Sequence, residues 1–346
     1  MNNLDQQFFY LHKWCIPVKG IVRSSICDFQ RETLELVPNE MCDILLDYNG
    51  SQIEKVFKAY EELEGSYDVI CEYFEFLVQK EFVYLTEKED VNISKVIMDT
   101  SYESPYHINS CIIDFNKDTD HPIKNIINEL NVLGCNALQL RFYDEITIAN
   151  FKAIIELTNN TAIRNVSIIM KYVSPEHHDD LKELLRKDYC RILDINIHSA
   201  PMVDAETEKV GNKNFTYSST VINDCSSCGV ISPYYFEKNY YTYTIGQNNN
   251  TCLYKKVSVD VTGEIKNCPS LKESLGNINS MTLADAILDP KLKRYWNITK
   301  DQISTCKTCE FRLVCTDCRA YTEDDKDIYA KPKKCNYDPE KAAWIS

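Results

Sequence analysis

Cysteines are the residues of this chain whose type and spacing could do chemistry, and most lie in its last third. Nine of the 16 cysteines fall between residues 225 and 335. The densest run is Cys306-Lys-Thr-Cys309, followed after five residues by Cys315-Thr-Asp-Cys318. Each Cys–x2–Cys turn places two sulfur atoms on one side of the backbone, where one metal ion or cluster can accept both. The run therefore indicates a metal centre.

Three interpretations of these cysteines are open on spacing alone. Disulfides need an oxidising compartment, but the first residues lack the basic start, apolar run and cleavage site of a secretory signal. A zinc ribbon usually separates its cysteine pairs by about 15–20 residues, whereas five residues separate Cys309 from Cys315. An iron–sulfur cluster is larger than an ion, and the last cysteine of a run can serve a second cluster.

The number of clustered cysteines fits two four-cysteine sites. Cys335 follows the run, and Cys252 and Cys268 precede it. One cysteine from the pair Cys225-Ser-Ser-Cys228 completes a set of eight. Two four-iron centres would use all of them.

The order of these residues resembles the SPASM domain, the auxiliary-cluster module at the C-terminus of radical-SAM peptide and protein maturases. The resemblance covers about residues 220–340 and includes Gly263, which stands five positions before Cys268. It implies two 4Fe-4S clusters. The outer cluster would be held by Cys306, Cys309, Cys315 and Cys335, and the inner one by Cys252, Cys268, Cys318 and either Cys228 or Cys225. Cys228 is our choice because it is nearer in sequence to Cys252.

Three shorter stretches are similar to the SPASM protein of grasp-with-spasm systems: residues 263–270, 276–278 and 309–321. In those systems such a protein is encoded beside an ATP-grasp ligase and a short precursor peptide. The resemblance implies a cytoplasmic accessory protein of ribosomal-peptide maturation. It would bind the precursor, or leader, peptide and present it to the ATP-grasp ligase.

The elements that would position the cysteines begin with a stretch that alternates strand and helix. Apolar runs predict strands, and apolar residues at 3–4 spacing predict the helices between them, which is typical of parallel βα units. With the SPASM resemblance, this stretch implies a shortened radical-SAM-like partial (β/α) barrel. We expect Asp120 to cap its first helix and Gly134 to end it. The predicted strands are residues 110–115, 137–143, 166–172 and 191–197, and the predicted helices are 123–133, 148–155 and 174–185.

The loop that should hold a catalytic cluster departs from the radical-SAM pattern. The family places Cys-x3-Cys-x2-Cys after the first barrel strand, but residues 114–121 contain no cysteine. The segment after the second strand, residues 141–145, lacks the glycine and glutamate motif that binds the SAM amine. We therefore predict no SAM site, no SAM cleavage and no independent catalytic residues. The alternatives are a redox peptide maturase that uses its auxiliary clusters, and a zinc-bound interaction module.

Residues 1–92 form a predicted winged-helix-like unit. It resembles the precursor-recognition element of peptide-modifying enzymes, and the alternative is a plain helical cap on the barrel. Strands are expected at 8–16, 20–29 and 82–85, with three helices between the second and third of them. The first helix would begin at Pro38, and Ser51 and Ser66 would cap the others. An exposed strand edge beside a helix can bind a peptide by β-augmentation.

Length and charge set the remaining expectations. The 346 residues predict three domains, at 1–92, 93–222 and 223–346. A net charge of −14 argues against nucleic acid and anionic membrane surfaces as partners. No apolar run approaches the roughly 20 residues that cross a bilayer. We expect His177 and His178 on a solvated helix face.

Overall fold

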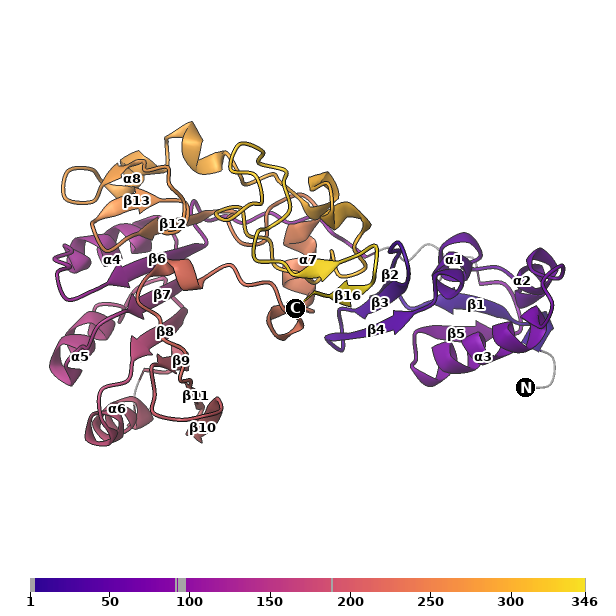
Figure 1. The fold of residues 1–346 in the computed structure, drawn as a ribbon, viewed down its shortest axis with the longest axis horizontal. Coiled ribbons are helices and arrows are strands. Elements are labelled where there is room, and N and C mark those ends of the chain that lie inside the picture. The colour runs from indigo at the N-terminus through magenta and orange to yellow at the C-terminus, as the bar shows by residue number, and fades with distance from the viewer. Residues whose placement is uncertain (1–3, 91, 93–97, 188, 346) are drawn as a thin grey trace.

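The computed structural model describes residues 4–90, 92, 98–187 and 189–345. It has a mixed α/β fold with one large sheet, whose nine strands run in the order β10-β11-β9-β8-β7-β6-β12-β13-β14. The chain is elongated in Figure 1, with the first helices and strands at one end and the large sheet at the other. The loop-rich C-terminal segment lies between them.

The centre of the sheet confirms the predicted βα units. Strands β6 (Ser110–Phe115), β7 (Ala137–Phe142), β8 (Asn165–Lys171) and β9 (Ile192–His198) pair in parallel in this order. They are connected by α4 (Ile123–Val132), α5 (Ile148–Glu156) and α6 (Pro175–Lys187). These helices bury apolar side chains, such as Ile126, Leu130 and Phe151, in one core with the strands.

The ends of α4 show which local signals determined the fold. Gly134 follows the helix with φ +76°, and a Cβ there would lie 2.6 Å from Tyr106, so glycine ends the helix as predicted. The helix begins at Ile123 as predicted, but Asp120 is not its cap, because Pro122 occupies the N-cap position. Proline fixes its own φ and thereby favours a helix start without a side-chain acceptor.

Strands from other parts of the chain extend both edges of the sheet. On one side, the hairpin β10 (Glu206–Val210) and β11 (Lys213–Tyr217), which we did not predict, adds next to β9. On the other side, β12 (Lys256–Val259) pairs in parallel with β6 and is followed by β13 (Glu264–Lys266) and β14 (Gly276–Asn277). The sheet thus crosses from the expected middle domain into the cysteine-rich segment.

The N-terminal unit has two more strands than predicted. The expected strand 8–16 is divided into β1 (Phe8–Leu11) and β2 (Cys15–Val18), because the chain turns where the Cys15 amide donates to the His12 carbonyl at 2.8 Å. Strands β3 (Ser24–Asp28) and β4 (Thr33–Val37) complete a three-stranded sheet with β2, and β5 (Val83–Thr86) pairs with β1.

The three predicted helices of this unit are present, but their serine caps are wrong. They are α1 (Asn39–Asp47), α2 (Ile53–Ala59) and α3 (Ser66–Gln79). Pro38 precedes α1 as expected. Gln52 and Gly65, rather than Ser51 and Ser66, occupy the N-cap positions of α2 and α3, and neither makes a side-chain cap bond.

The C-terminal segment contains little regular structure. Its longer elements are α7 (Tyr240–Gly246) and α8 (Leu283–Ala286), and the two-residue strands β15 (Tyr337–Asp338) and β16 (Ala343–Trp344) form a small ribbon near its end. A separate apolar cluster joins this segment to the N-terminal unit, with Phe29 stacked on Tyr243 at 4.1 Å. Arg23 also contacts Glu310 at 2.9 Å across the same junction.

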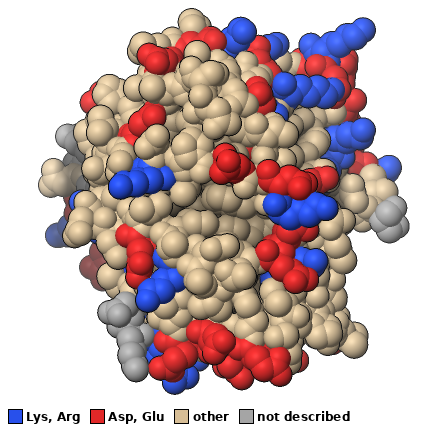
Figure 2. Space-filling model, turned by 90° about the vertical axis from the view of Figure 1, so that its left-hand side faces the viewer, with Lys and Arg blue, Asp and Glu red and all other residues tan. Residues whose placement is uncertain are grey.

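The helix-covered end of the molecule has a mixed surface. Figure 2 shows Lys and Arg interspersed with Asp and Glu on this side.

The expectation that both histidines lie on a solvated helix face is wrong for His178, which is 2% exposed and stacks on Tyr172 with ring centres 4.6 Å apart. Burial lowers the pKa of His178 to about 4. Within the described residues, no helix is both long and apolar enough to cross a membrane.

Candidate metal centre

Four predicted ligands line one cavity on the open face of the sheet. Cys228, Cys252, Cys268 and Cys318 come from four separate segments and border a space of about 400 Å³. Much of the remaining lining is apolar, including Ile169 of β8 and Leu253. We call these four cysteines the inner group.

The β12–β13 hairpin places two members of the inner group. Cys252 precedes β12 and Cys268 follows β13, so the antiparallel pairing brings both to the same end of the hairpin. Gly263 makes the turn with φ +86°, which only glycine adopts readily. The side-chain amide of Asn267 then donates to the carbonyls of Leu253 (3.0 Å) and Lys256 (2.7 Å), which holds the two cysteine-bearing segments together.

A second glycine brings Cys318 close to Cys228. Gly229 follows Cys228 with φ +86°, and a Cβ on it would lie only 2.8 Å from the Cys318 sulfur. The Lys334 ammonium lies 4.3 Å from the centre of the Tyr321 ring and donates to the Cys228 carbonyl at 2.6 Å. The Cys225–Cys228 turn is therefore held against the segment that carries Cys318 by both steric fit and hydrogen bonding.

The other four predicted ligands form a second cluster in the loop-rich segment. The pKa of the Cys306 thiol is raised to about 11, chiefly by burial and further by neighbours that include Cys315 and Cys335. Burial raises the pKa of the Cys309 thiol to about 12, and Cys315 and Cys306 add to the shift. Cys309, Cys315 and Cys335 pack against one apolar cluster. The Cys309 amide donates to the Cys306 carbonyl at 3.0 Å, so Cys306, Cys309, Cys315 and Cys335 lie in one region. We call them the outer group.

Each group has one lysine in contact with a sulfur atom. Lys256 Nζ lies 3.5 Å from Cys252 Sγ in the inner group, and Lys300 Nζ lies 3.6 Å from Cys315 Sγ in the outer group. Burial alone would lower the pKa of both lysines, but the neighbouring cysteines, and for Lys300 also Asp317, raise it. An ammonium that touches a thiol sulfur favours the thiolate, which is the form that ligates metals.

An ion pair closes the sheet side of the inner cavity. Arg141 of β7 binds Asp114 of β6 through two bonds of 2.6 and 2.8 Å, and the Tyr143 hydroxyl donates to the same carboxylate at 2.8 Å. Arg141 and Tyr143 line the cavity, and the pair is 5% and 2% exposed. Burial raises the pKa of Asp114, while Arg141 and Tyr143 oppose that shift. Strand β6 thus carries a buried, ion-paired carboxylate one residue before its C-terminal end.

Sequence reasoning identified the cysteines and missed the charged side chains around them. Lys256, Lys300 and Asp317 have no motif of their own, although Asp317 stands inside the Cys315–Cys318 run. Cys228 lines the inner cavity. Burial raises the pKa of the Cys225 thiol, and the charges of Asp114 and Arg141 in the ion pair also act on it. The position of Cys225 relative to the ion pair could be found only from the fold.

The arrangement of the thiols bears on the kind of metal they suit. In the part of the chain that the structure describes, no three His, Cys, Asp or Glu side chains are arranged to hold one metal ion. A cubane cluster has a different requirement, because each cysteine binds a different iron atom. Such a cluster takes four thiolates, and four cysteines line the inner cavity.

Comparisons with known proteins give a distant structural likeness. No family model and no curated protein matches the chain. A crystal structure of Streptococcus suis SuiB bound to S-adenosylmethionine is similar with a TM-score of 0.34 and 11% identity, over 90% of this chain and 96% of that one. A second SuiB structure gives 0.30 and 10% over the same shares. Scores this low do not assign a family, so function must be argued from the residues.

Proposed function

We propose that this chain is an accessory protein of ribosomal-peptide maturation that carries two 4Fe-4S clusters. Cys228, Cys252, Cys268 and Cys318 would hold the inner cluster, and Cys306, Cys309, Cys315 and Cys335 the outer one. The observation that carries the proposal is that Cys228, Cys252, Cys268 and Cys318 line one cavity. It is supported by the packing of Cys309, Cys315 and Cys335 against a different apolar cluster and by a lysine contact to Cys252 and to Cys315.

Metal–thiolate bonds would supply what the loop-rich segment lacks. Metal ligation can contribute folding free energy to segments that have little core of their own. The outer group lies in a region of short 3-10 turns, including Cys306–Thr308, and two-residue strands. A cluster there would fix the surface that packs against the N-terminal unit.

The N-terminal unit is the proposed site for the precursor peptide. Strand β4 is an edge of the β2-β3-β4 sheet, and its Leu36 side chain is 43% exposed. Helix α3 lies beside this strand, where Lys80 contacts Glu35 at 2.5 Å. An extended leader could add to β4 through main-chain hydrogen bonds and place an apolar side chain against Leu36.

The test combines peptide binding with ligase kinetics. A labelled precursor should bind the purified protein, and the partner ATP-grasp ligase should modify the precursor faster when the protein is present. Leu36→Asp should weaken binding, whereas Leu46→Asp, at an exposed site on α1, should not. A ligase that runs equally fast without the protein would contradict the presenting role.

A redox enzyme is a second candidate, favoured by the cavity next to the inner group. The apolar space bounded by Ile169 and Leu253 adjoins four cysteines and has room for a side chain of a peptide substrate. Conversion of the precursor by this protein alone, with a chemical reductant or oxidant and no ligase, would establish that class.

A further inference from the structure

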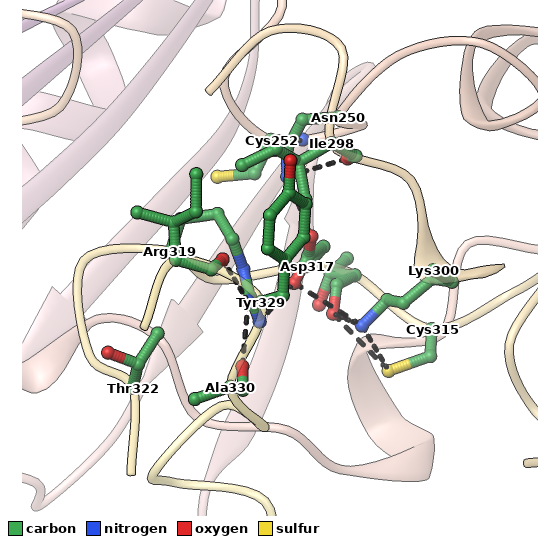
Figure 3. A network of polar contacts seen from close by, with 12 residues as sticks. Asn250, Cys252, Ile298, Lys300, Cys315, Asp317, Arg319, Thr322, Tyr329 and Ala330 are labelled. Carbon is green, nitrogen blue, oxygen red and sulfur yellow. Dashed lines mark hydrogen bonds and ion pairs between the residues drawn. The ribbon is translucent and has the colours of Figure 1, made fainter. Parts of the chain in front are cut away.

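A continuous polar network runs from the outer group to the inner group (Figure 3). Lys300 Nζ, in contact with Cys315 Sγ, also lies 3.6 Å from Asp317 Oδ1. The other oxygen of Asp317 accepts from the Asn250 side-chain amide at 2.7 Å. The side-chain oxygen of Asn250, Oδ1, in turn accepts from the backbone amide of Cys252 at 3.0 Å.

The charged members of this network are removed from solvent. The side chains of Lys300, Asp317 and Arg319 are 10%, 3% and 0% exposed. Arg319 pairs with Asp317 at 2.8 Å and donates to the carbonyls of Ile328 and Ala330. Because solvent screens these charges weakly, each acts strongly on any group held by Cys315.

We propose that Lys300 and Asp317 are positioning residues of the outer centre and that their opposite charges set its reduction potential. The inference rests on the proposed outer cluster. Lys300 donates to a ligand sulfur and places a positive charge beside it, while Asp317 holds the ammonium in place and partly cancels its charge. Hydrogen bonds to cluster sulfurs and net local charge are among the factors that tune such potentials.

The two residues should act in opposite directions. Reduction adds a negative charge to the centre, so a nearby cation makes reduction easier and a nearby anion makes it harder. Lys300→Met removes the cation and should lower the midpoint potential of the outer centre. Asp317→Asn leaves Lys300 and Arg319 uncompensated and should raise it. Lys300→Arg keeps the charge and should restore a potential near that of the unchanged protein.

The experiment is a potentiometric titration of the anaerobically reconstituted full chain, followed by electron paramagnetic resonance. Lys256→Met identifies the inner centre, because Lys256 contacts Cys252 and its loss should lower the other potential. Lys272→Met is the matched control, since Lys272 forms a solvent-exposed pair with Asp325, whose charges water screens, and should change neither potential.

Opposite shifts for Lys300→Met and Asp317→Asn would support the inference. If both variants keep their iron and the outer potential stays unchanged, or moves the same way in both, the inference is overturned while the proposed function stands. If the unchanged protein binds no iron, the proposed function fails first. Iron content of each variant separates a lost cluster from a shifted potential.

Discussion

The large sheet and the C-terminal segment are held together by different forces. The sheet buries apolar side chains from helices and strands in one continuous core, which includes Ile113, Leu140 and Ile168. Residues 299–345 contain only short 3-10 turns and two-residue strands, and their buried groups include Glu310, Asp317 and Arg319. The first region gains stability from removing apolar surface from water, whereas the second combines a smaller apolar cluster with buried polar contacts.

This difference indicates where each region should fail. Loss of a ligand should affect the C-terminal segment and leave the sheet folded, because the sheet core does not depend on the outer cysteines. Loss of an ion-pair partner inside the sheet should affect the whole molecule. The predictions below separate these responses, from the largest expected effect to the smallest.

Removing the outer group should have the largest effect and should be local. With Cys306→Ser and Cys315→Ser combined, we expect residues 299–345 to become sensitive to limited proteolysis while the sheet persists as a resistant fragment. Cys190→Ser is the control, since Cys190 is an exposed cysteine far along the sequence from both groups. A double variant as resistant as the control would contradict metal support of the segment.

Breaking the buried pair of the sheet should destabilise the molecule as a whole. Asp114→Asn leaves the Arg141 charge buried without its partner, which should cost about 3–5 kcal/mol in the free energy of unfolding. Urea denaturation followed by circular dichroism would measure this loss. Lys272→Met, which breaks the exposed pair with Asp325, should have no measurable effect.

Acidification should destabilise the sheet through His178. Burial lowers its pKa from the ordinary 6.5 to about 4 in the folded state. The unfolded chain therefore takes up a proton first, and stability present above pH 6.5 is lost as pH falls towards 4. The loss should approach roughly 3 kcal/mol. His178→Phe should remove this part of the pH dependence in denaturation curves, and a curve identical to that of the unchanged protein would contradict it.

Glycine at the inner group provides the smallest and most local test. Gly229→Ala forces an unfavourable φ and puts a Cβ 2.8 Å from Cys318 Sγ, so it should cost about 2 kcal/mol and lower the metal content of the inner group. Gly211→Ala shares the positive φ but meets open space, so it should cost about 1 kcal/mol. Equal behaviour of the two variants would show that the contact with Cys318 is unimportant.

The same contrast explains how far sequence reasoning could go. Periodic apolar residues predicted β6 to β9 and α4 to α6, because each pattern reports one buried face. The cysteine count also suggested two sets of four; one predicted set, Cys228, Cys252, Cys268 and Cys318, lines a single cavity, and the ligand assignment itself stays a prediction. Sequence reasoning could not predict that Lys300 contacts Cys315 or that β12 pairs with β6, because these contacts depend on the path of the chain in space. The Thr33–Val37 strand was missed because only one of its five residues is buried, so its apolar pattern is weak.

The central claim is tested most directly by the iron and acid-labile sulfide content of protein purified without oxygen. Our account predicts about eight irons and eight sulfides per chain, and about half of each when Cys306 and Cys315 are replaced by serine. Zinc with little sulfide, or cysteines joined to one another in disulfides, would contradict it.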